Sequence, residues 1–101
     1  MKPDAFIRMR FRTTVEGGRE NNIIILDIPY GCPLLVDNEA FDCRILIKNK
    51  TLFLGETYEL PIKLLSPELA FPRLFPGKTV KLWEGKDIAS GEVLRVYVEA
   101  K

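Results

Sequence analysis

Glycine-containing turns separate the 101-residue chain into short segments of alternating or β-branched side chains. Glycine suits such turns because it accepts the positive φ angles that a tight chain reversal requires. The glycines that we assign to these structural positions are Gly17, Gly18, Gly55, Gly77, Gly85 and Gly91. Short strands with a turn every ~8–12 residues are typical of all-β barrels and sandwiches. Because a closed sheet has no exposed edge, we predict a small closed antiparallel β-barrel of about six strands.

The first predicted strand covers residues 5–14, where apolar and polar side chains alternate with period two. One face carries Ile7, Met9 and Phe11, and the other carries Arg8, Arg10 and Arg12. Further strands are predicted at residues 22–28, 34–36, 41–48, 52–54, 57–65, 78–83 and 88–98. Polar turns are expected at residues 37–39 and 49–51, and no helix of useful length is expected.

Details of these strands carry further expectations. The run 22–28 is almost continuously β-branched, which is typical of a strand covered on both faces. Pro29, Gly31 and Pro33 are expected to interrupt the sheet after it. Pro61 should mark an edge position or a bulge, because proline cannot donate to a ladder. In the last strand, Leu94, Val96 and Val98 should face one way, and Arg95, Tyr97 and Glu99 the other.

The proline-containing stretch 66–77 is predicted to be irregular, and its apolar side chains should cap one end of the barrel. These side chains are Leu69, Phe71, Leu74 and Phe75.

Length and composition restrict the class of protein. A chain of this length is expected to form one domain, residues 1–101. No apolar run approaches the ~20 residues of a membrane helix, and no apolar signal region follows the N-terminal charge. We therefore expect a cytoplasmic protein with no membrane contact. The net charge of +1 does not indicate the basic excess that is usual for nucleic-acid binding.

The residue types for common catalytic chemistry are sparse. The chain has no histidine, which removes Ser-His-Asp and Cys-His catalysis and most zinc sites. The carboxylates are scattered, and no pair has a spacing that suggests acid–base catalysis. We therefore predict no enzyme activity, no catalytic residue, no cofactor and no metal site. Cys32 and Cys43 are interpreted as structural thiols, and a disulfide between them stays geometrically open.

Three motifs occur in a characteristic order along the chain. The first is Glu16, Gly17, Gly18 and Arg19, and the second is Gly55, Glu56, Leu65 and Pro67. The third comprises Gly77, Val80, Leu82, Glu84, Gly85, Gly91 and Val93. Together, from Phe6 to Val96, they resemble the C-terminal β-barrel domain (domain III) of translation elongation factor Tu, here as a stand-alone domain. The resemblance implies the fold of that domain.

In that family the domain packs on its two neighbouring domains, touches the T-stem of aminoacyl-tRNA and contacts the exchange factor. Several positions depart from the family pattern. Residues 30–36 lack the Arg and Gln of the family, and residues 39–41 replace its Thr-Thr-Asp. Arg19 and Gly91 match positions near the tRNA-facing side. The chain has no phosphate-cradling loop, and Asn49-Lys50-Thr51-Leu52 lacks the Asp of a guanine-reading motif, so GTP binding is not expected.

Two places on the predicted surface could bind a partner. The Arg8, Arg10 and Arg12 stripe has a spacing of roughly 6.5–7 Å, which could follow a phosphate backbone or an acidic protein surface. The stripe could equally be a solvated face, with Arg19 extending it only if the fold brings it near. Trp83 could anchor a partner or cover the barrel end beside Phe75.

The function that these observations favour is a non-enzymatic protein-binding module whose partner is another cytoplasmic protein. The alternative is an RNA- or tRNA-binding, translation-associated domain that uses the Arg8, Arg10 and Arg12 face. A third interpretation is an immunity-type or regulatory protein. The oligomeric state and the identity of the partner stay open.

Overall fold

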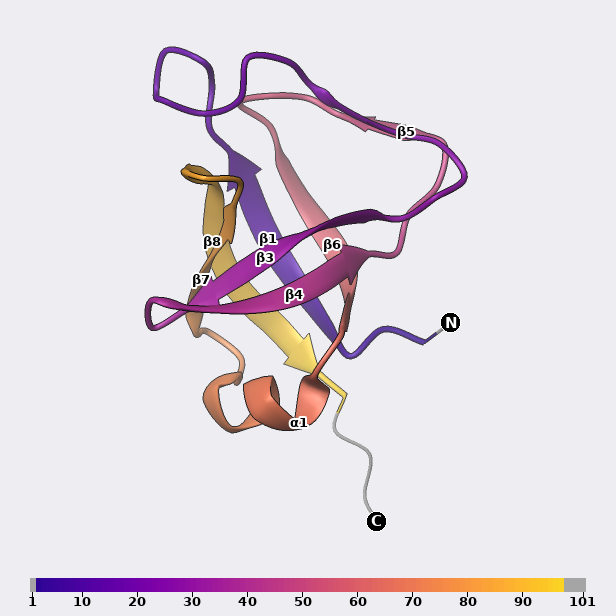
Figure 1. Cartoon of the computed structure of the whole chain (residues 1–101), viewed down its shortest axis with the longest axis vertical. Helices are drawn as coiled ribbons and strands as arrows, with labels where there is room; N and C mark the ends of the chain where they lie inside the picture. The colour runs from indigo at the N-terminus through magenta and orange to yellow at the C-terminus, as the bar shows by residue number, and fades with distance from the viewer. Residues whose placement is uncertain (1, 98–101) are drawn as a thin grey trace.

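Six strands close into an antiparallel barrel in the order β1-β6-β4-β3-β7-β8, in a computed structural model that describes residues 2–97 (Figure 1). The barrel strands are β1 (Ala5–Phe11), β3 (Tyr30–Val36), β4 (Glu39–Ile45), β6 (Thr57–Leu64), β7 (Thr79–Trp83) and β8 (Asp87–Val96). The short strands β2 (Ile23–Ile25) and β5 (Lys50–Leu52) form a separate pair. The helical turns α1 (Pro67–Ala70) and η1 (Phe71–Arg73) lie between β6 and β7. The predicted all-β closed barrel of about six strands is confirmed.

A single long hairpin supplies four of the eight strands. β3 pairs with β4 from Tyr30 opposite Ile45, and β2 pairs with β5 in the same register, with Ile23 opposite Leu52. The N–H of Asn49 donates to the carbonyl of Leu26 at 3.0 Å and links the two parts. The hairpin therefore begins as part of the barrel and continues beyond it. We call the outer part, formed by β2, β5 and residues 26–29, 46–49 and 53, the flap.

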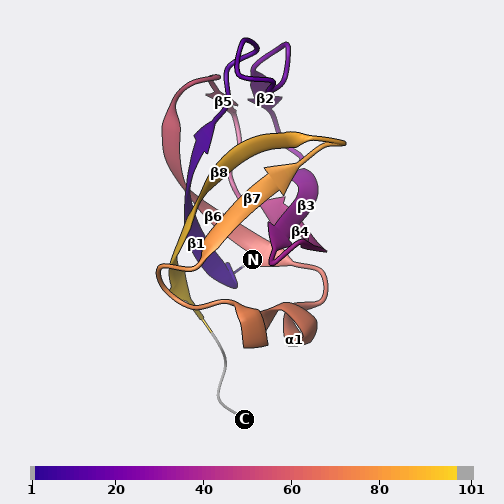
Figure 2. The same cartoon turned by 90° about the vertical axis from the view of Figure 1, so that its left-hand side faces the viewer.

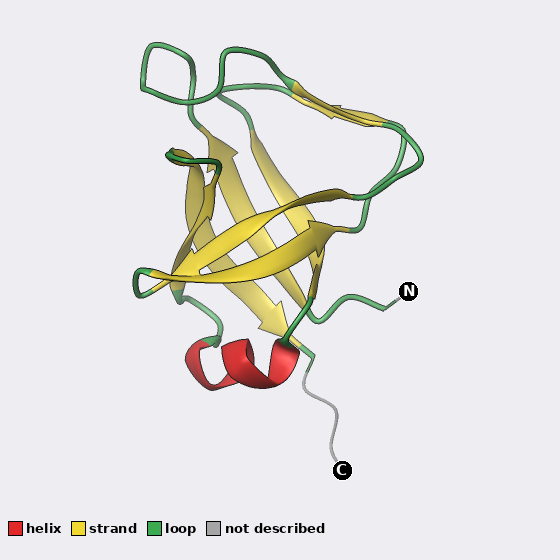
Figure 3. Cartoon of the chain, viewed as in Figure 1, coloured by secondary structure: helices red, strands yellow, loops and turns green. Residues whose placement is uncertain are grey.

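The flap and α1 lie at opposite ends of the molecule (Figures 1 and 2). Figure 3 shows the strands of the barrel between them, with the helical turns at one end. At the flap end, the buried side chains are Ile23, Ile25 and Leu52. At the α1 end, the buried side chains are Ala70 and Leu74. Both ends of the barrel are thus closed by apolar side chains.

The inward face of β1 is as the alternation predicts, because Ile7, Met9 and Phe11 are fully buried and Arg8 and Arg10 are exposed. Gly91, predicted as a turn glycine, lies inside β8 instead, and it is so close to β1 that a Cβ atom there would overlap the carbonyl of Arg8. Gly18 is similar, since a Cβ there would lie 2.6 Å from the carbonyl oxygen of Arg12. The predicted turn glycines with positive φ are Gly17, Gly55, Gly77 and Gly85.

The first predicted strand is too long. β1 ends at Phe11 rather than at residue 14, because the backbone of Thr13 is used by a turn. Its carbonyl accepts hydrogen bonds from the N–H groups of Glu16 and Gly18 at 3.1 and 2.9 Å, and its own N–H donates to the Glu16 carboxylate at 2.9 Å.

The prediction that residues 22–28 form a strand covered on both faces is wrong. Only Ile23–Ile25 is a strand, and its single partner is β5. One face of this strand is buried against the barrel, while Ile24 and Leu26 point away from it and are exposed. The β-branched run is therefore covered on one side only.

The predicted break at Gly31 and Pro33 is also wrong, because both residues lie inside β3. The β3–β7 ladder includes only Leu34 and Leu35 of β3, so on that side Gly31 and Pro33 have no ladder partner that requires a backbone N–H. The turn after β3 is shorter than predicted and consists of Asp37 and Asn38, with φ of 51° and 66°. Two successive left-handed residues are typical of a type I′ hairpin turn.

Other boundaries shift by a few residues. β4 ends at Ile45 rather than at residue 48, and residues 50 and 51 belong to β5 rather than to a turn. Pro61 lies within β6, one residue beyond the end of the β4 ladder, where a missing N–H is tolerated. β6, β7 and β8 otherwise agree with the predicted strands.

The predicted faces of the last strand hold for residues 94–97, since Leu94 and Val96 are half-buried and Arg95 and Tyr97 are exposed. A register shift beside Leu94 makes Val93 the buried residue instead. The predicted positions of Val98 and Glu99 lie outside the described residues.

The predicted cap of residues 66–77 is partly wrong in its side chains. Leu74 is buried and Phe71 packs against the core, but Leu69 and Phe75 are exposed. The one-turn helix α1 directs Ala70 inward, a residue too small for the hydrophobic pattern to reveal.

Candidate protein-binding surface

The predicted arginine stripe is matched by carboxylates on the neighbouring strands. Arg8 forms ion pairs with Glu92 of β8 at 3.0 Å and with Glu59 of β6 at 3.6 Å. Arg10 donates two hydrogen bonds to the Glu16 carboxylate, at 2.9 and 3.3 Å. Exposed ion pairs contribute little to stability, but they do reduce the local positive potential. The stripe is therefore a mixed-charge face.

An open hollow lies on this same face of the barrel. It is lined by the side chains of Arg8, Arg10, Thr57, Thr79, Ser90 and Glu92, together with Gly91. A phosphate bound there would have to displace carboxylates from the two guanidinium groups. Arg12 lies just after β1 and is half-buried, with its N–H bonded to the carbonyl of Ile88 at 2.9 Å. The geometry thus gives the nucleic-acid alternative little additional support.

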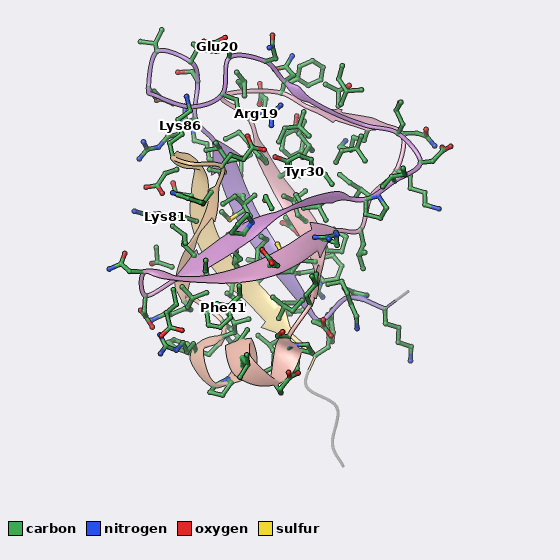
Figure 4. The ribbon with its side chains drawn as sticks, in the orientation of Figure 1. Arg19, Glu20, Tyr30, Phe41, Lys81 and Lys86 are labelled. Atoms are coloured by element: carbon green, nitrogen blue, oxygen red, sulfur yellow. The ribbon has the colours of Figure 1, made fainter. Side chains whose placement is uncertain are left out.

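Arg19 makes several contacts within the protein. One of its guanidinium nitrogens donates to both carboxylate oxygens of Glu84, at 2.9 and 2.7 Å, and to the Tyr30 hydroxyl at 3.2 Å. Its Nε donates to the carbonyl of Asn21 at 3.0 Å. Figure 4 shows Arg19 and Tyr30 side by side in the space between the loop before β2 and strand β3. Arg19, predicted as a binding residue, joins three segments of the fold.

Trp83 lies at the C-terminal end of β7 and keeps 40% of its surface exposed. Phe75 precedes the start of the same strand, where the Lys78 ammonium lies 5.6 Å from its ring centre. The two aromatic residues are therefore at opposite ends of β7, and Trp83 does not cover the barrel end beside Phe75. Trp83 stays a candidate anchor on the protein surface.

An apolar face that the sequence reasoning missed lies on the outside of the flap. Its four side chains, Ile24, Leu26, Ile28 and Phe53, are 70%, 65%, 81% and 52% exposed. We call these four residues the flap face. The residues that alternate with them, such as Ile23 and Ile25, are 2% exposed because they close the end of the barrel. The signal in the sequence is the run 22–28, which is apolar at both parities.

The charged residues of the flap alternate with the flap face rather than surround it. Asp27 lies between Leu26 and Ile28, and Lys50 is paired with the buried Ile25, on the side of the sheet opposite to Ile24. The Lys50 ammonium lies 5.4 Å from the ring centre of Tyr58. Large exposed apolar side chains grouped in one place are typical of interaction sites.

Residues 2–97 contain no group of three or more His, Cys, Asp or Glu side chains that could hold a metal ion. Within the same range, no helix is long and apolar enough to cross a membrane. In comparisons with known proteins, no family model matches the chain, and no curated protein matches it.

Proposed function

We propose that this protein is a stand-alone barrel of the elongation factor Tu C-terminal type that acts as a non-enzymatic, cytoplasmic protein-binding module. The observation that carries the proposal is the flap face. Ile24, Leu26 and Ile28 belong to a run whose sequence is typical of burial on both sides, and Phe53 follows β5. All four side chains present apolar surface to water. A partner protein would supply the missing cover.

The energetics of such a contact are favourable but modest. Complete burial of a side chain such as Ile or Leu contributes about 1.5–3 kcal/mol. Association costs at least about 4 kcal/mol in lost translational and rotational freedom. The flap face can therefore anchor a complex, while the surface around it would complete an interface of about 800 Å² on each partner.

The partner that fits this face is a protein surface with an apolar patch of its own. The chain as a whole has a net charge of +1, so neither a strongly acidic nor a strongly basic partner is selected. The resemblance agrees with this chemistry, because in the elongation factor Tu family the corresponding barrel packs against neighbouring protein domains.

Site-specific photo-cross-linking in the native host tests the proposal. A benzophenone side chain would replace Ile24 in one variant and Phe53 in another. A third variant carries it at Leu69, which is 63% exposed but lies on α1 at the other end of the molecule. We expect the same partner at positions 24 and 53 and its absence at position 69. Equal capture at all three positions, or none at the flap, would contradict the proposal.

Light scattering of the purified protein distinguishes a foreign partner from a second copy of this chain. We expect a monomer at micromolar concentration. A dimer that Ile24→Asp dissociates would instead identify the flap face as a surface for self-association.

A further inference from the structure

Cys32 of β3 and Cys43 of β4 are directly opposite each other in the β3–β4 ladder. Both are free thiols and both are buried inside the barrel, with 6% and 0% of their surfaces exposed. The Cys43 thiol donates a hydrogen bond to the carbonyl oxygen of Cys32 at 3.3 Å. The two sulfur-bearing side chains therefore lie on the same face of the sheet and close together.

The backbone geometry suits a covalent link between them. On β4, Asp42 and Leu46 bond toward β6, to Leu65 and Pro61. Since alternate residues bond to opposite neighbours, Cys43 bonds toward β3 and forms a hydrogen-bonded pair with Cys32. Such a pair has Cα atoms about 5.5 Å apart. This Cα separation is inside the range of roughly 4.4–6.8 Å that disulfides span. The Cβ atoms of a hydrogen-bonded pair are about 5.5 Å apart, so the two strands must also move slightly closer to reach the ~3.5–4.5 Å of a disulfide.

The two thiols are not equivalent. The pKa of Cys32 is lowered, first by the neighbouring Cys43 thiol, and further by the backbone of Trp83 and the charges of Arg19 and Arg44, against the opposing effect of burial. The pKa of Cys43 is raised, first by the Cys32 thiol beside it and then because the Cys43 thiol is buried. Cys32 is thus both the more accessible thiol and the one that ionises first.

We propose that Cys32 and Cys43 form a redox site that hydroperoxides oxidise to an intramolecular disulfide. The Cys32 thiolate attacks the peroxide, an S–O bond forms, the O–O bond breaks, and the alkoxide or hydroxide leaves with the thiol proton as alcohol or water. Cys43 then attacks the sulfenic acid at Cys32. An S–S bond forms, the S–O bond breaks, and the second oxygen leaves as water with the Cys43 proton. Two thiols and one hydroperoxide thus give one disulfide, one alcohol and one water.

The site lies where the flap leaves the barrel. Only two residue pairs of the β3–β4 ladder lie between this site and the flap, Gly31 with Arg44 and Tyr30 with Ile45. A disulfide would fix the two strands of the hairpin at this point. The backbone of Trp83, the only tryptophan of the chain, lies near enough to Cys32 to affect its pKa, so Trp83 fluorescence should report oxidation.

Treatment of the purified full-length chain with hydrogen peroxide tests the site. Non-reducing peptide mapping should show a Cys32–Cys43 disulfide within monomers, with loss of both free thiols and a change in Trp83 fluorescence that dithiothreitol reverses. In Cys43→Ala, oxidation should stop at a sulfenic acid on Cys32 that dimedone traps. In Cys32→Ala, the buried Cys43 should stay reduced.

Persistence of both thiols in the folded wild-type chain under these conditions would overturn the proposal, as would disulfides formed only between molecules. If an alanine variant does not fold, the test uses the wild-type chain alone. The proposal requires that its disulfide forms in native buffer. A disulfide that forms only after unfolding by denaturant would contradict the proposal.

Discussion

Arg19 and Glu84 are 65 residues apart in the chain, yet one guanidinium nitrogen of Arg19 donates to both oxygens of the Glu84 carboxylate. The pair joins the loop before β2 to the turn between β7 and β8. Its side chains are only 25% and 29% exposed, so water screens the interaction less than it does for the ion pairs of Arg8. The contact holds the flap end of the molecule to the barrel.

Replacement of Arg19 should therefore destabilise the fold. We expect Arg19→Ala to lower the free energy of unfolding by about 1–3 kcal/mol, because Glu84 and the Tyr30 hydroxyl lose a charged donor. Urea denaturation measures the change. Arg10→Ala is the matched control, since its ion pair with Glu16 is exposed and should cost less than about 1 kcal/mol. Equal losses of unfolding free energy in the two variants would show that the Arg19 contacts stabilise the fold no more than an exposed ion pair does.

The flap offers a pair of identical neighbouring residues with opposite environments. Ile24 is 70% exposed and Ile23 is 2% exposed. We expect Ile24→Asp to change the free energy of unfolding by less than about 0.5 kcal/mol, while abolishing capture of the partner. Ile23→Asp should cost more than about 3 kcal/mol, because it buries an unpaired carboxylate. Thermal denaturation measures the change in stability, and the cross-linking assay measures the loss of partner capture. A large loss of stability in Ile24→Asp would mean that the outer face supports the fold.

The arginine stripe gives a third prediction that separates the two surfaces. Replacement of Arg8, Arg10 and Arg12 together by alanine should leave cross-linking at Phe53 unchanged, because the stripe and the flap face belong to different parts of the fold. In filter-binding assays, we expect the wild-type chain to show no salt-dependent affinity for RNA, and therefore none for the triple variant to lose. Such an affinity would favour the nucleic-acid alternative instead.

Gly91 and Gly77 test how the barrel closes. A Cβ at Gly91 meets the backbone of Arg8 on the facing strand, whereas a Cβ at Gly77 meets open space at a φ of 91°. Gly77→Ala should cost about 1 kcal/mol through backbone strain alone. Gly91→Ala should cost about 3 kcal/mol or more, because β1 and β8 must separate. Similar midpoints in guanidinium denaturation for both variants would contradict the close crossing of β1 and β8.

The sequence predicted the barrel well where local signals and tertiary packing agree. The alternation of Ile7, Met9 and Phe11 and the turn glycines required nothing beyond their own segments. The hairpin was predicted poorly because its register is a property of two distant segments. Asn49 and Leu26 are joined by a hydrogen bond that no local pattern encodes. Gly31 and Pro33 indicate breaks by residue type alone, because the absence of a neighbouring strand beside them depends on the tertiary fold.

The candidate site was harder to predict than the fold. Arg19 is a typical binding residue by composition, and only the position of Glu84 shows that it is used internally. The flap face was missed for a related reason. The apolar run from residue 22 indicates burial, and sequence alone does not reveal that one of its faces lies outside the barrel. The facing of Cys32 and Cys43 likewise depends on the register of β3 and β4.

Glu16 provides a prediction about pH. Its pKa is lowered to about 2, chiefly because Arg10 donates hydrogen bonds to its carboxylate and the Thr13 N–H donates another. In the unfolded chain the pKa should return to about 4.3. The ionised form is thus favoured by folding, so its contribution to stability is complete above about pH 4.3 and is lost as the pH falls toward 2. The stability of Glu16→Gln should therefore approach that of the wild type in acid. Carboxyl chemical shifts of Glu16 followed by NMR measure the pKa directly, and a midpoint near 4.3 in the folded protein would refute the role of Arg10.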